Sequence, residues 1–268
     1  MMPVWTERRE GAVAVLSYRN PPRNFLTFAA LAELGEILRQ ISADDTISVV
    51  VLRSAVPGYF VAHADLEELA RLAAGPVQEA RSWYTTMRLV ETMPQPVIAA
   101  INGQSWGGGV ELALSCALRW ASAAAHFALI ETSLGIIPGA GGTQRLIRLL
   151  GRGDATELVL SGEVVDAERA REIGLVGRVF ATENFDEAVL TAATAMARKP
   201  LTALAAAKRV LRDGAELSIA DAFRLEGATF ADLLATPESV ALQEHARHIY
   251  ANTADDEPVR FGTDRMVN

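Results

Sequence analysis

Two glutamates in apolar surroundings, Glu111 and Glu131, are the residues of this sequence best suited to move protons. Glu111 follows three consecutive glycines, residues 107–109, and the segment around it, VELALSCAL, has a helical composition. Glu131 follows the apolar segment FALI. Burial raises the pKa of a carboxyl group, which allows one of the pair to stay protonated near neutral pH while the other acts as a base.

The three glycines predict a site at which a ligand approaches the main chain closely, because no Cβ stands in the way. Free N–H groups at the start of a helix point towards negative charge on such a ligand. Donors of this kind stabilise an oxyanion that develops during a reaction. Combined with two carboxylates, they predict an enzyme that couples an oxyanion site to proton transfer.

The elements around the glycines predict an α/β fold. Residues 96–101 form an apolar run bounded by Pro and Gly, which is typical of a buried strand. Upstream, residues 4–18 predict two short strands, residues 28–41 a helix and residues 47–52 a β-branched strand. Strand, helix and strand in this order favour a parallel arrangement.

Three motifs, in this order along the chain, resemble the enoyl-CoA hydratase/isomerase (crotonase) family. They are INGQSWGGGVEL from residue 101, FALIETSLG from residue 127 and IPGAGGTQRL from residue 137. The resemblance implies a crotonase-like spiral of βα turns over residues 1–199. It also implies a C-terminal helical region, residues 200–268, that packs in a homotrimer or a dimer of trimers.

By this resemblance, the N–H groups of Ala64 and Gly108 form the oxyanion hole. Glu111 accepts a proton from water, and Glu131 delivers a proton to the α-carbon of a 2-enoyl-CoA. The implied reaction is hydration to a 3-hydroxyacyl-CoA; isomerisation of an enoyl-CoA, or another reaction of the family, is the alternative. Coenzyme A belongs to the substrate, and no further cofactor or metal is expected. Eight more positions are expected to bind substrate: Arg23, Phe25, Ala62, Asp65, Leu66, Trp106, Pro138 and Gly139.

The sequence departs from the family pattern at two places. In F-x-A-G-A-D, His63 occupies the glycine position, one residue before the expected oxyanion donor Ala64. We expect His63 to be a tolerated loop residue and Asp65 to cap the following helix. The Phe…Lys-Arg motif with which many family members end is missing, since the corresponding helix reads ALQEHARHIY. No coenzyme contact is therefore assigned to this end of the chain.

A serine hydrolase is the main alternative from another class. Residues 103–107 read G-Q-S-W-G, which matches the G-x-S-x-G of a nucleophile elbow with Ser105 as the nucleophile. His245 and His248 lie downstream, with several Asp residues in between. Against this reading, three glycines in a row are poor helix formers immediately after a nucleophile elbow, and no HGGG-type oxyanion segment precedes the motif. The hydrolase therefore ranks below the crotonase interpretation.

Two further classes are weaker. Residues 139–142, Gly-Ala-Gly-Gly, do not fit the G-x-G-x-x-G of a dinucleotide-binding loop, and no His/Cys spacing suggests a metal site. A crotonase-fold scaffold without chemistry is the other possibility, and the presence of both Glu111 and Glu131 argues against it.

Composition limits the partners and the cellular location expected of this protein. The chain has 268 residues, a net charge of −8 and no Lys/Arg cluster, which argues against a nucleic-acid partner. No apolar run is long enough for a membrane span, and the first residues have no apolar leader. The single cysteine, Cys116, fits a reducing compartment and is expected to be buried. These features predict a cytoplasmic, soluble protein, and the family resemblance implies that its small-molecule substrate is an acyl-CoA.

The C-terminal third changes character. Strand patterns end, and amphipathic helices are predicted at 186–198, 201–212, 217–234 and 237–250. The polar tail, residues 251–268, is expected to be loosely ordered.

Overall fold

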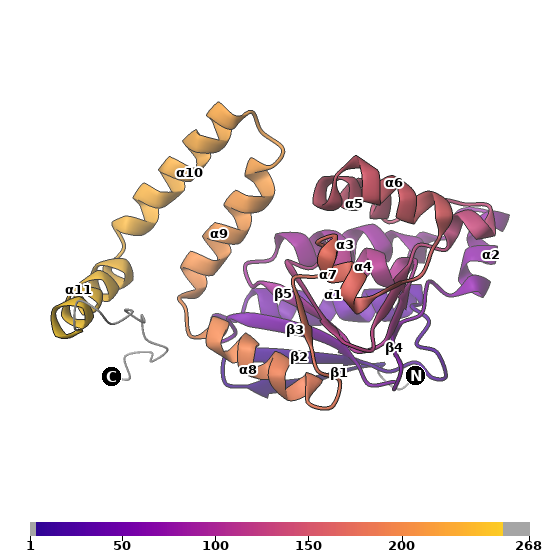
Figure 1. Ribbon diagram of the computed structural model, residues 1–268, viewed down its shortest axis with the longest axis horizontal. Coiled ribbons are helices and arrows are strands. Elements are labelled where there is room, and N and C mark those ends of the chain that lie inside the picture. The colour runs from indigo at the N-terminus through magenta and orange to yellow at the C-terminus, as the bar shows by residue number, and fades with distance from the viewer. Residues whose placement is uncertain (1–3, 254–268) are drawn as a thin grey trace.

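The computed structural model describes residues 4–253, which form two β-sheets covered by helices, with three further helices at the C-terminal end (Figure 1). The larger sheet has six strands in the order β1-β2-β3-β5-β7-β10, and the smaller has four in the order β4-β6-β8-β9. The larger sheet contains β1 (Trp5–Glu10), β2 (Val13–Tyr18), β3 (Val49–Ser54), β5 (Val97–Ile101), β7 (Leu118–Ser122) and β10 (Arg178–Phe180). The smaller contains β4 (Tyr59–Val61), β6 (Gln104–Trp106), β8 (His126–Ala128) and β9 (Val165–Asp166).

The helices fall into two groups. Those of the core are α1 (Phe28–Ser42), α2 (Leu66–Ala74), η1 (Gln78–Ala80), α3 (Arg81–Thr92), α4 (Gly108–Ser115), η2 (Glu131–Leu134), α5 (Gly142–Leu150), α6 (Arg152–Ser161), α7 (Ala167–Glu172) and α8 (Phe185–Ala197). Those of the C-terminal region are α9 (Leu201–Gly214), α10 (Ile219–Leu234) and α11 (Pro237–Asn252). No helix within residues 4–253 is both long enough and apolar enough to cross a membrane.

Successive turns of the chain build both sheets at once, which confirms the predicted spiral. β3, β5 and β7 pair in parallel in the larger sheet, and each is followed by a short strand, β4, β6 or β8, of the smaller sheet. The corners between the sheets stack directly on one another. A Cβ at Gly103 would lie 2.3 Å from the carbonyl carbon of Gly58, so no larger residue fits at this corner.

Alternating residues of the central strands form two cores. On β3, Val50 and Leu52 face the helices α1, α3 and α4, whereas Val49 and Val51 face α8. Every residue of β5 is buried, because the strand is covered on both faces. This is the pattern expected of a parallel sheet with helices on both sides, and Figure 1 shows α8 on one side of the sheet and α1, α3 and α4 on the other.

Most predicted elements are found within a few residues of their expected positions. The predicted helix at 28–41 is α1, and its N-cap Thr27 accepts a hydrogen bond from the N–H of Ala30. Residues 77–93 have the composition of a single helix, but Val77 is still extended and the 3₁₀ turn η1 precedes α3. Of the tail, residues 251 and 252 belong to α11, and residues 254–268 lie outside the described residues.

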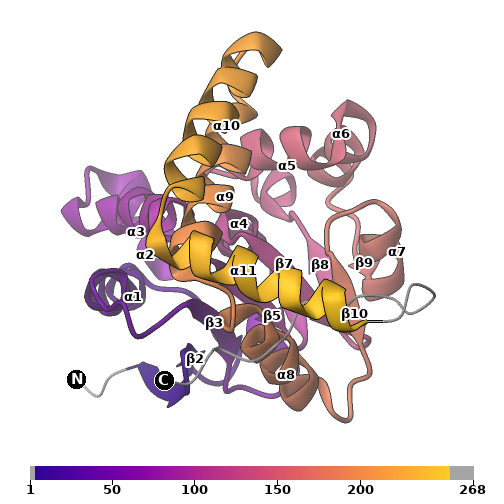
Figure 2. The same ribbon diagram turned by 90° about the vertical axis from the view of Figure 1, so that its left-hand side faces the viewer.

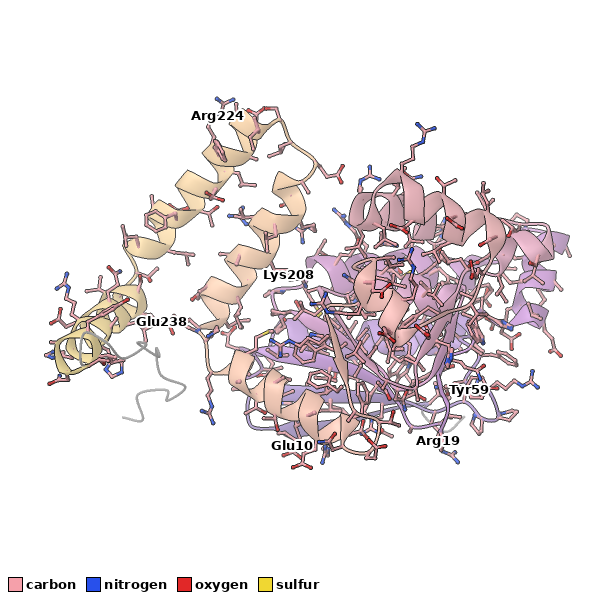
Figure 3. The ribbon with its side chains drawn as sticks, viewed as in Figure 1. Glu10, Arg19, Tyr59, Lys208, Arg224 and Glu238 are labelled. Atoms are coloured by element: carbon pink, nitrogen blue, oxygen red, sulfur yellow. The ribbon has the colours of Figure 1, made fainter. Side chains whose placement is uncertain are left out.

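The C-terminal helices extend to one side of the sheets. Figure 1 shows α9, α10 and α11 on the left, and Figure 2 views the molecule from that side. Lys208 joins α9 to the core, because its Nζ donates to the carbonyls of Val90, Met93 and Gln95 at 3.0, 2.9 and 2.9 Å (Figure 3). The boundary predicted at residue 199 falls between α8 and α9. The division into two regions stays a prediction.

Candidate active site

The glycine segment predicted to meet a ligand is the turn between β6 and α4. Gly107 has φ +47° and ψ −116°, a conformation that an L-residue rarely adopts, and α4 begins directly after it. A Cβ at Gly107 would lie 2.9 Å from Glu131 Oε1, and one at Gly109 would lie 2.2 Å from the carbonyl oxygen of Val61. The main chain therefore passes against a carboxylate on one side and against β4 on the other.

Ala64 and Gly108 lie close together across this turn. A Cβ at Gly108 would be 3.3 Å from the N atom of Ala64. The loop of Ala64 is fixed by Leu26, whose N–H donates to His63 O and whose carbonyl accepts from Asp65 N–H. This pairing leaves the Ala64 N–H outside the bridge, and within residues 4–253 neither it nor the Gly108 N–H donates a hydrogen bond. Two unused donors thus lie side by side.

His63 is accommodated beside the oxyanion loop. Its Nδ1 is 2.6 Å from the carbonyl oxygen of Ala64, and its ring packs on Phe25 with a centroid distance of 4.6 Å. The imidazole is half-buried, and its contacts are with the Phe25 ring and the carbonyl of Ala64.

Glu111 is held in the first turn of α4 by the loop that precedes α5. Its Oε1 accepts from the N–H groups of Ala140 at 2.7 Å and Gly142 at 2.8 Å. The side chain is 4 % exposed, and this burial raises the pKa of the Glu111 carboxyl. The two N–H donors and the charge of Arg145 act in the opposite direction, because they favour the carboxylate.

Glu131 begins the 3₁₀ turn η2 and is 7 % exposed. Burial raises its pKa to about 7, and the nearby carboxylate of Glu111 contributes in the same direction. Its Oε2 is buried and has no hydrogen-bond partner within the described part of the chain. Such an atom is costly to leave unpaired, so it suits a carboxyl group that carries a proton or meets a ligand.

Both glutamates line a cavity of about 380 Å³, a size that is ordinary for small-molecule sites. Ala64 and Gly139, two of the predicted site residues, line it as well. The remaining wall comes mainly from α2, α3 and the segment after η2: Phe28, Leu69, Leu72, Ala73, Ala80, Trp83, Tyr84, Ile136, Ile137 and Ala140. The cavity therefore joins two carboxyl groups to a largely apolar chamber.

Seven of the predicted substrate-binding residues do not line this cavity: Arg23, Phe25, Ala62, Asp65, Leu66, Trp106 and Pro138. Arg23 and Leu66 are exposed, and Ala62 and Pro138 are buried. Asp65 caps α2, as expected, since its Oδ1 accepts from the N–H groups of Glu67 and Glu68. Trp106 lies on β6 and donates from Nε1 to Gln104 Oε1 at 3.1 Å.

Trp83 and Tyr84 are cavity residues that the sequence reasoning missed. Trp83 is buried, and its ring reaches Gly108, because a Cβ at that glycine would lie 2.6 Å from Trp83 Cη2. The Tyr84 hydroxyl donates to the carbonyl of Gly139 at 2.9 Å. The only signal in the sequence is an aromatic pair in the helix before the central strand, which is equally typical of a helix that packs on a core.

The geometry of a nucleophile elbow is absent at Ser105. Its side chain is 0 % exposed, and its Oγ has no hydrogen-bond partner among residues 4–253. His245 lines a cavity between the C-terminal helices, and His248 lies near Glu244 of the same helix.

Cys116 is buried, as expected, and burial raises the pKa of its thiol to about 12. Among the described residues, no three His, Cys, Asp or Glu side chains are grouped as metal ligands would be.

The spiral of βα turns, with its glycine turn and adjacent carboxyl groups, defines a crotonase-fold protein. The family model for enoyl-CoA hydratase/isomerase matches residues 8–255, and the chain belongs to this family. The chain is 39 % identical over 232 residues to 2,3-dehydroadipyl-CoA hydratase of Escherichia coli (strain K12), covering 86 % of this chain and 90 % of the relative.

Two further comparisons agree on the family. Methylglutaconyl-CoA hydratase from mitochondria of Mus musculus is 35 % identical over 240 residues, covering 87 % of this chain and 76 % of the relative. The crystal structure of enoyl-CoA hydratase from Bacillus anthracis superposes with a TM-score of 0.85 at 35 % identity, covering 91 % of this chain and 96 % of that chain.

Proposed function

We propose that this protein hydrates a 2-enoyl-CoA thioester to a 3-hydroxyacyl-CoA. The observation that carries the proposal is the meeting of two buried glutamates, Glu111 and Glu131, in the cavity that Ala64 also lines. Hydration needs a base for water and an acid for the α-carbon, and an isomerase that moves one proton needs a single carboxylate. The names of the hydratase relatives support the same reaction class.

In the proposed mechanism, the N–H groups of Ala64 and Gly108 donate to the thioester carbonyl oxygen and stabilise the enolate. Glu111 takes a proton from water while the water oxygen bonds to the β-carbon. Glu131 then gives its proton to the α-carbon, and the carbonyl is restored. The two N–H donors on Glu111 favour its carboxylate form, and a pKa of about 7 leaves Glu131 partly protonated at neutral pH.

The cavity walls support an acyl group that is itself apolar. Leu69, Leu72, Ile136 and Ile137 face the space, and no Lys or Arg within the described residues lines it. A second carboxylate on the acyl chain would lie beside two carboxyl groups without a cation to pair with. We therefore propose neutral 2-enoyl-CoA esters as substrates in preference to the dicarboxylic esters after which the two hydratase relatives are named.

The test is the loss of the conjugated-enone absorbance of crotonyl-CoA and of a longer 2-enoyl-CoA. Glu111→Gln and Glu131→Gln should each lower kcat by about 10²- to 10⁴-fold, because each removes a positioned proton transfer. Glu157→Gln, at an exposed position of α6, is the matched control and should retain full activity.

Three outcomes would contradict parts of the proposal. A folded wild type that binds acyl-CoA and hydrates none of these esters contradicts the hydratase assignment. Conversion of a 3-enoyl-CoA that survives loss of one glutamate indicates an isomerase instead. A higher kcat/KM for 2,3-dehydroadipyl-CoA than for a neutral ester of the same length contradicts the apolar acyl group.

We also propose that the C-terminal helices assemble the protein into a homotrimer or a dimer of trimers. Large apolar side chains on these helices are exposed in the single chain: Leu211, Ile219, Phe223, Phe230, Val240 and Tyr250. Exposed apolar surface of this kind is typical of a protein interface. Light scattering coupled to size exclusion tests the proposal, and a monomeric mass would overturn it.

A cytoplasmic location is proposed on the basis of the single, buried cysteine.

A further inference from the structure

We propose that Tyr84 is a positioning residue for Glu111, acting through the peptide group that joins Gly139 to Ala140. The Tyr84 hydroxyl donates to the carbonyl oxygen of this peptide at 2.9 Å. The N–H of the same peptide donates to Glu111 Oε1 at 2.7 Å. The inference rests on the proposed function, in which Glu111 is the base that activates water.

The two peptide groups that bind Glu111 are supported differently. The Gly142 N–H belongs to a peptide whose carbonyl, Gly141 O, accepts from the N–H of Arg145 at 2.9 Å, a regular bond of the first turn of α5. The support of this peptide comes from the backbone, so most substitutions would preserve it. The Gly139–Ala140 peptide is supported by the hydroxyl of a side chain. Tyr84 is therefore the part of the arrangement that a single substitution removes.

A hydrogen bond to a peptide carbonyl polarises the group and strengthens donation by its N–H, an effect that operates along chains of hydrogen bonds. The Tyr84 hydroxyl should thus stabilise the carboxylate form of Glu111 as well as its orientation. Tyr84 is 65 % exposed and lines the cavity, so a bound acyl group would cover it. Exclusion of water strengthens such a bond, because the effective dielectric falls.

The next peptide of the loop is held independently of Tyr84. Arg145 Nη1 donates to the carbonyl of Ala140 at 2.6 Å, and Arg145 Nε donates to Glu91 Oε1 at 2.5 Å. These bonds fix the loop from the α5 side and remain when the Tyr84 hydroxyl is removed. Tyr84→Phe should therefore fold normally, keep the ring in the cavity wall and change only the Gly139 end of the loop.

The experiment compares the wild type with Tyr84→Phe on a 2-enoyl-CoA across pH. We expect kcat to fall about three- to tenfold, which corresponds to one hydrogen bond of ordinary strength, with KM changed less than about twofold. The acid limb of the kcat profile should move to higher pH, because a less stabilised carboxylate binds its proton more tightly. Thr85→Val is the matched control, since that hydroxyl bonds to Arg81 O on the same helix, and it should match the wild type.

A second measurement does not depend on turnover. The carboxyl titration of Glu111, followed by ¹³C NMR with glutamate labelling and assigned with Glu111→Gln, should shift upward in Tyr84→Phe. A fluorotyrosine at position 84, which is a stronger donor, should shift it downward. If the wild type hydrates no enoyl-CoA but these titrations shift, the proposed function fails and the positioning role stands. The role of Tyr84 would be overturned if Tyr84→Phe kept the kcat of the wild type and the titration of Glu111 did not move. A change in KM alone would also overturn it.

Discussion

The indole of Trp83 fills the space beside Gly108, so that a Cβ on this glycine would come within 2.6 Å of Trp83 Cη2 and 3.0 Å of Cζ3. The same Cβ would lie 3.3 Å from the N atom of Ala64. Gly108→Ala must therefore displace the Trp83 ring or the main chain of Gly108 and Ala64, whose N–H groups are proposed to bind the thioester oxygen. We expect kcat to fall about 10²- to 10³-fold, the usual effect of losing one oxyanion donor.

A second glycine provides the control for this prediction. Gly153 lies in α6, and a Cβ there would meet nothing within 4 Å. Gly153→Ala should leave kcat unchanged, and thermal unfolding should show that both variants are folded. Near-normal turnover by folded Gly108→Ala would argue against Gly108 as an oxyanion donor.

The pKa of Glu131 gives a pH-dependent stability with a definite sign. The value of about 7 in the folded protein lies above the ordinary 4.5. Between these two pH values the folded chain binds more protons than the unfolded chain, so stability falls as pH rises from 4.5 to 7 and then levels off. The Tm of wild type should follow this course, and the Tm of Glu131→Gln should depend less on pH over the same window.

The same pKa predicts how the activity depends on pH. If protonated Glu131 supplies the proton to the α-carbon, kcat/KM for a 2-enoyl-CoA should decline as pH rises above about 7. An activity that is flat from pH 6 to pH 9, with chemistry limiting the rate, would exclude Glu131 as the acid. A solvent isotope effect on kcat checks that chemistry limits the rate.

Loss of Lys208 should loosen the contact between α9 and the core. Lys208→Met keeps an apolar stem of similar length but leaves the carbonyls of Val90, Met93 and Gln95 without their shared donor. We expect the free energy of unfolding to fall by about 2–4 kcal/mol, since unpaired buried carbonyls are costly. Lys199→Met, at an exposed position, is the control and should change stability little. Equal denaturation midpoints for the two variants would contradict this prediction.

Ser105 offers a direct test against the hydrolase alternative. Because its Oγ is buried and unpaired, Ser105→Ala should leave hydratase activity intact and should not lower Tm. The wild type should also resist labelling by a fluorophosphonate probe. Labelling that disappears in Ser105→Ala would restore the hydrolase reading.

Local patterns predicted the strands and the glycine turn because both depend on neighbouring residues. The apolar run at residues 96–101 is β5, and the glycines at 107–109 enter α4. The predicted division of the chain followed the loss of strand patterns, and α8 to α11 are helical as expected. These features follow from period and composition, which the sequence displays directly.

The walls of the cavity were not predictable in the same way. Leu69, Leu72, Trp83 and Tyr84 come from α2 and α3, and their meeting with Glu131 depends on how distant segments pack. The hydrogen bond from the Tyr84 hydroxyl to the Gly139 carbonyl joins residues that are 55 positions apart in the sequence. Trp106, adjacent to the glycines in sequence, was expected in the substrate pocket, yet it lies on β6 and does not line the cavity.

Helix α2 contributes Leu69, Leu72 and Ala73 to the cavity and contains no buried residue of its own. The chemical half of the site, in contrast, is built from glycines, main-chain N–H groups and carboxyl groups embedded in the core. Substitutions in α2 can therefore reshape the chamber at little expense to the stability of the fold or the placement of Glu111. For the proposed hydratase, this separation implies that changes in α2 would alter acyl preference while leaving Glu111 and Glu131 in place.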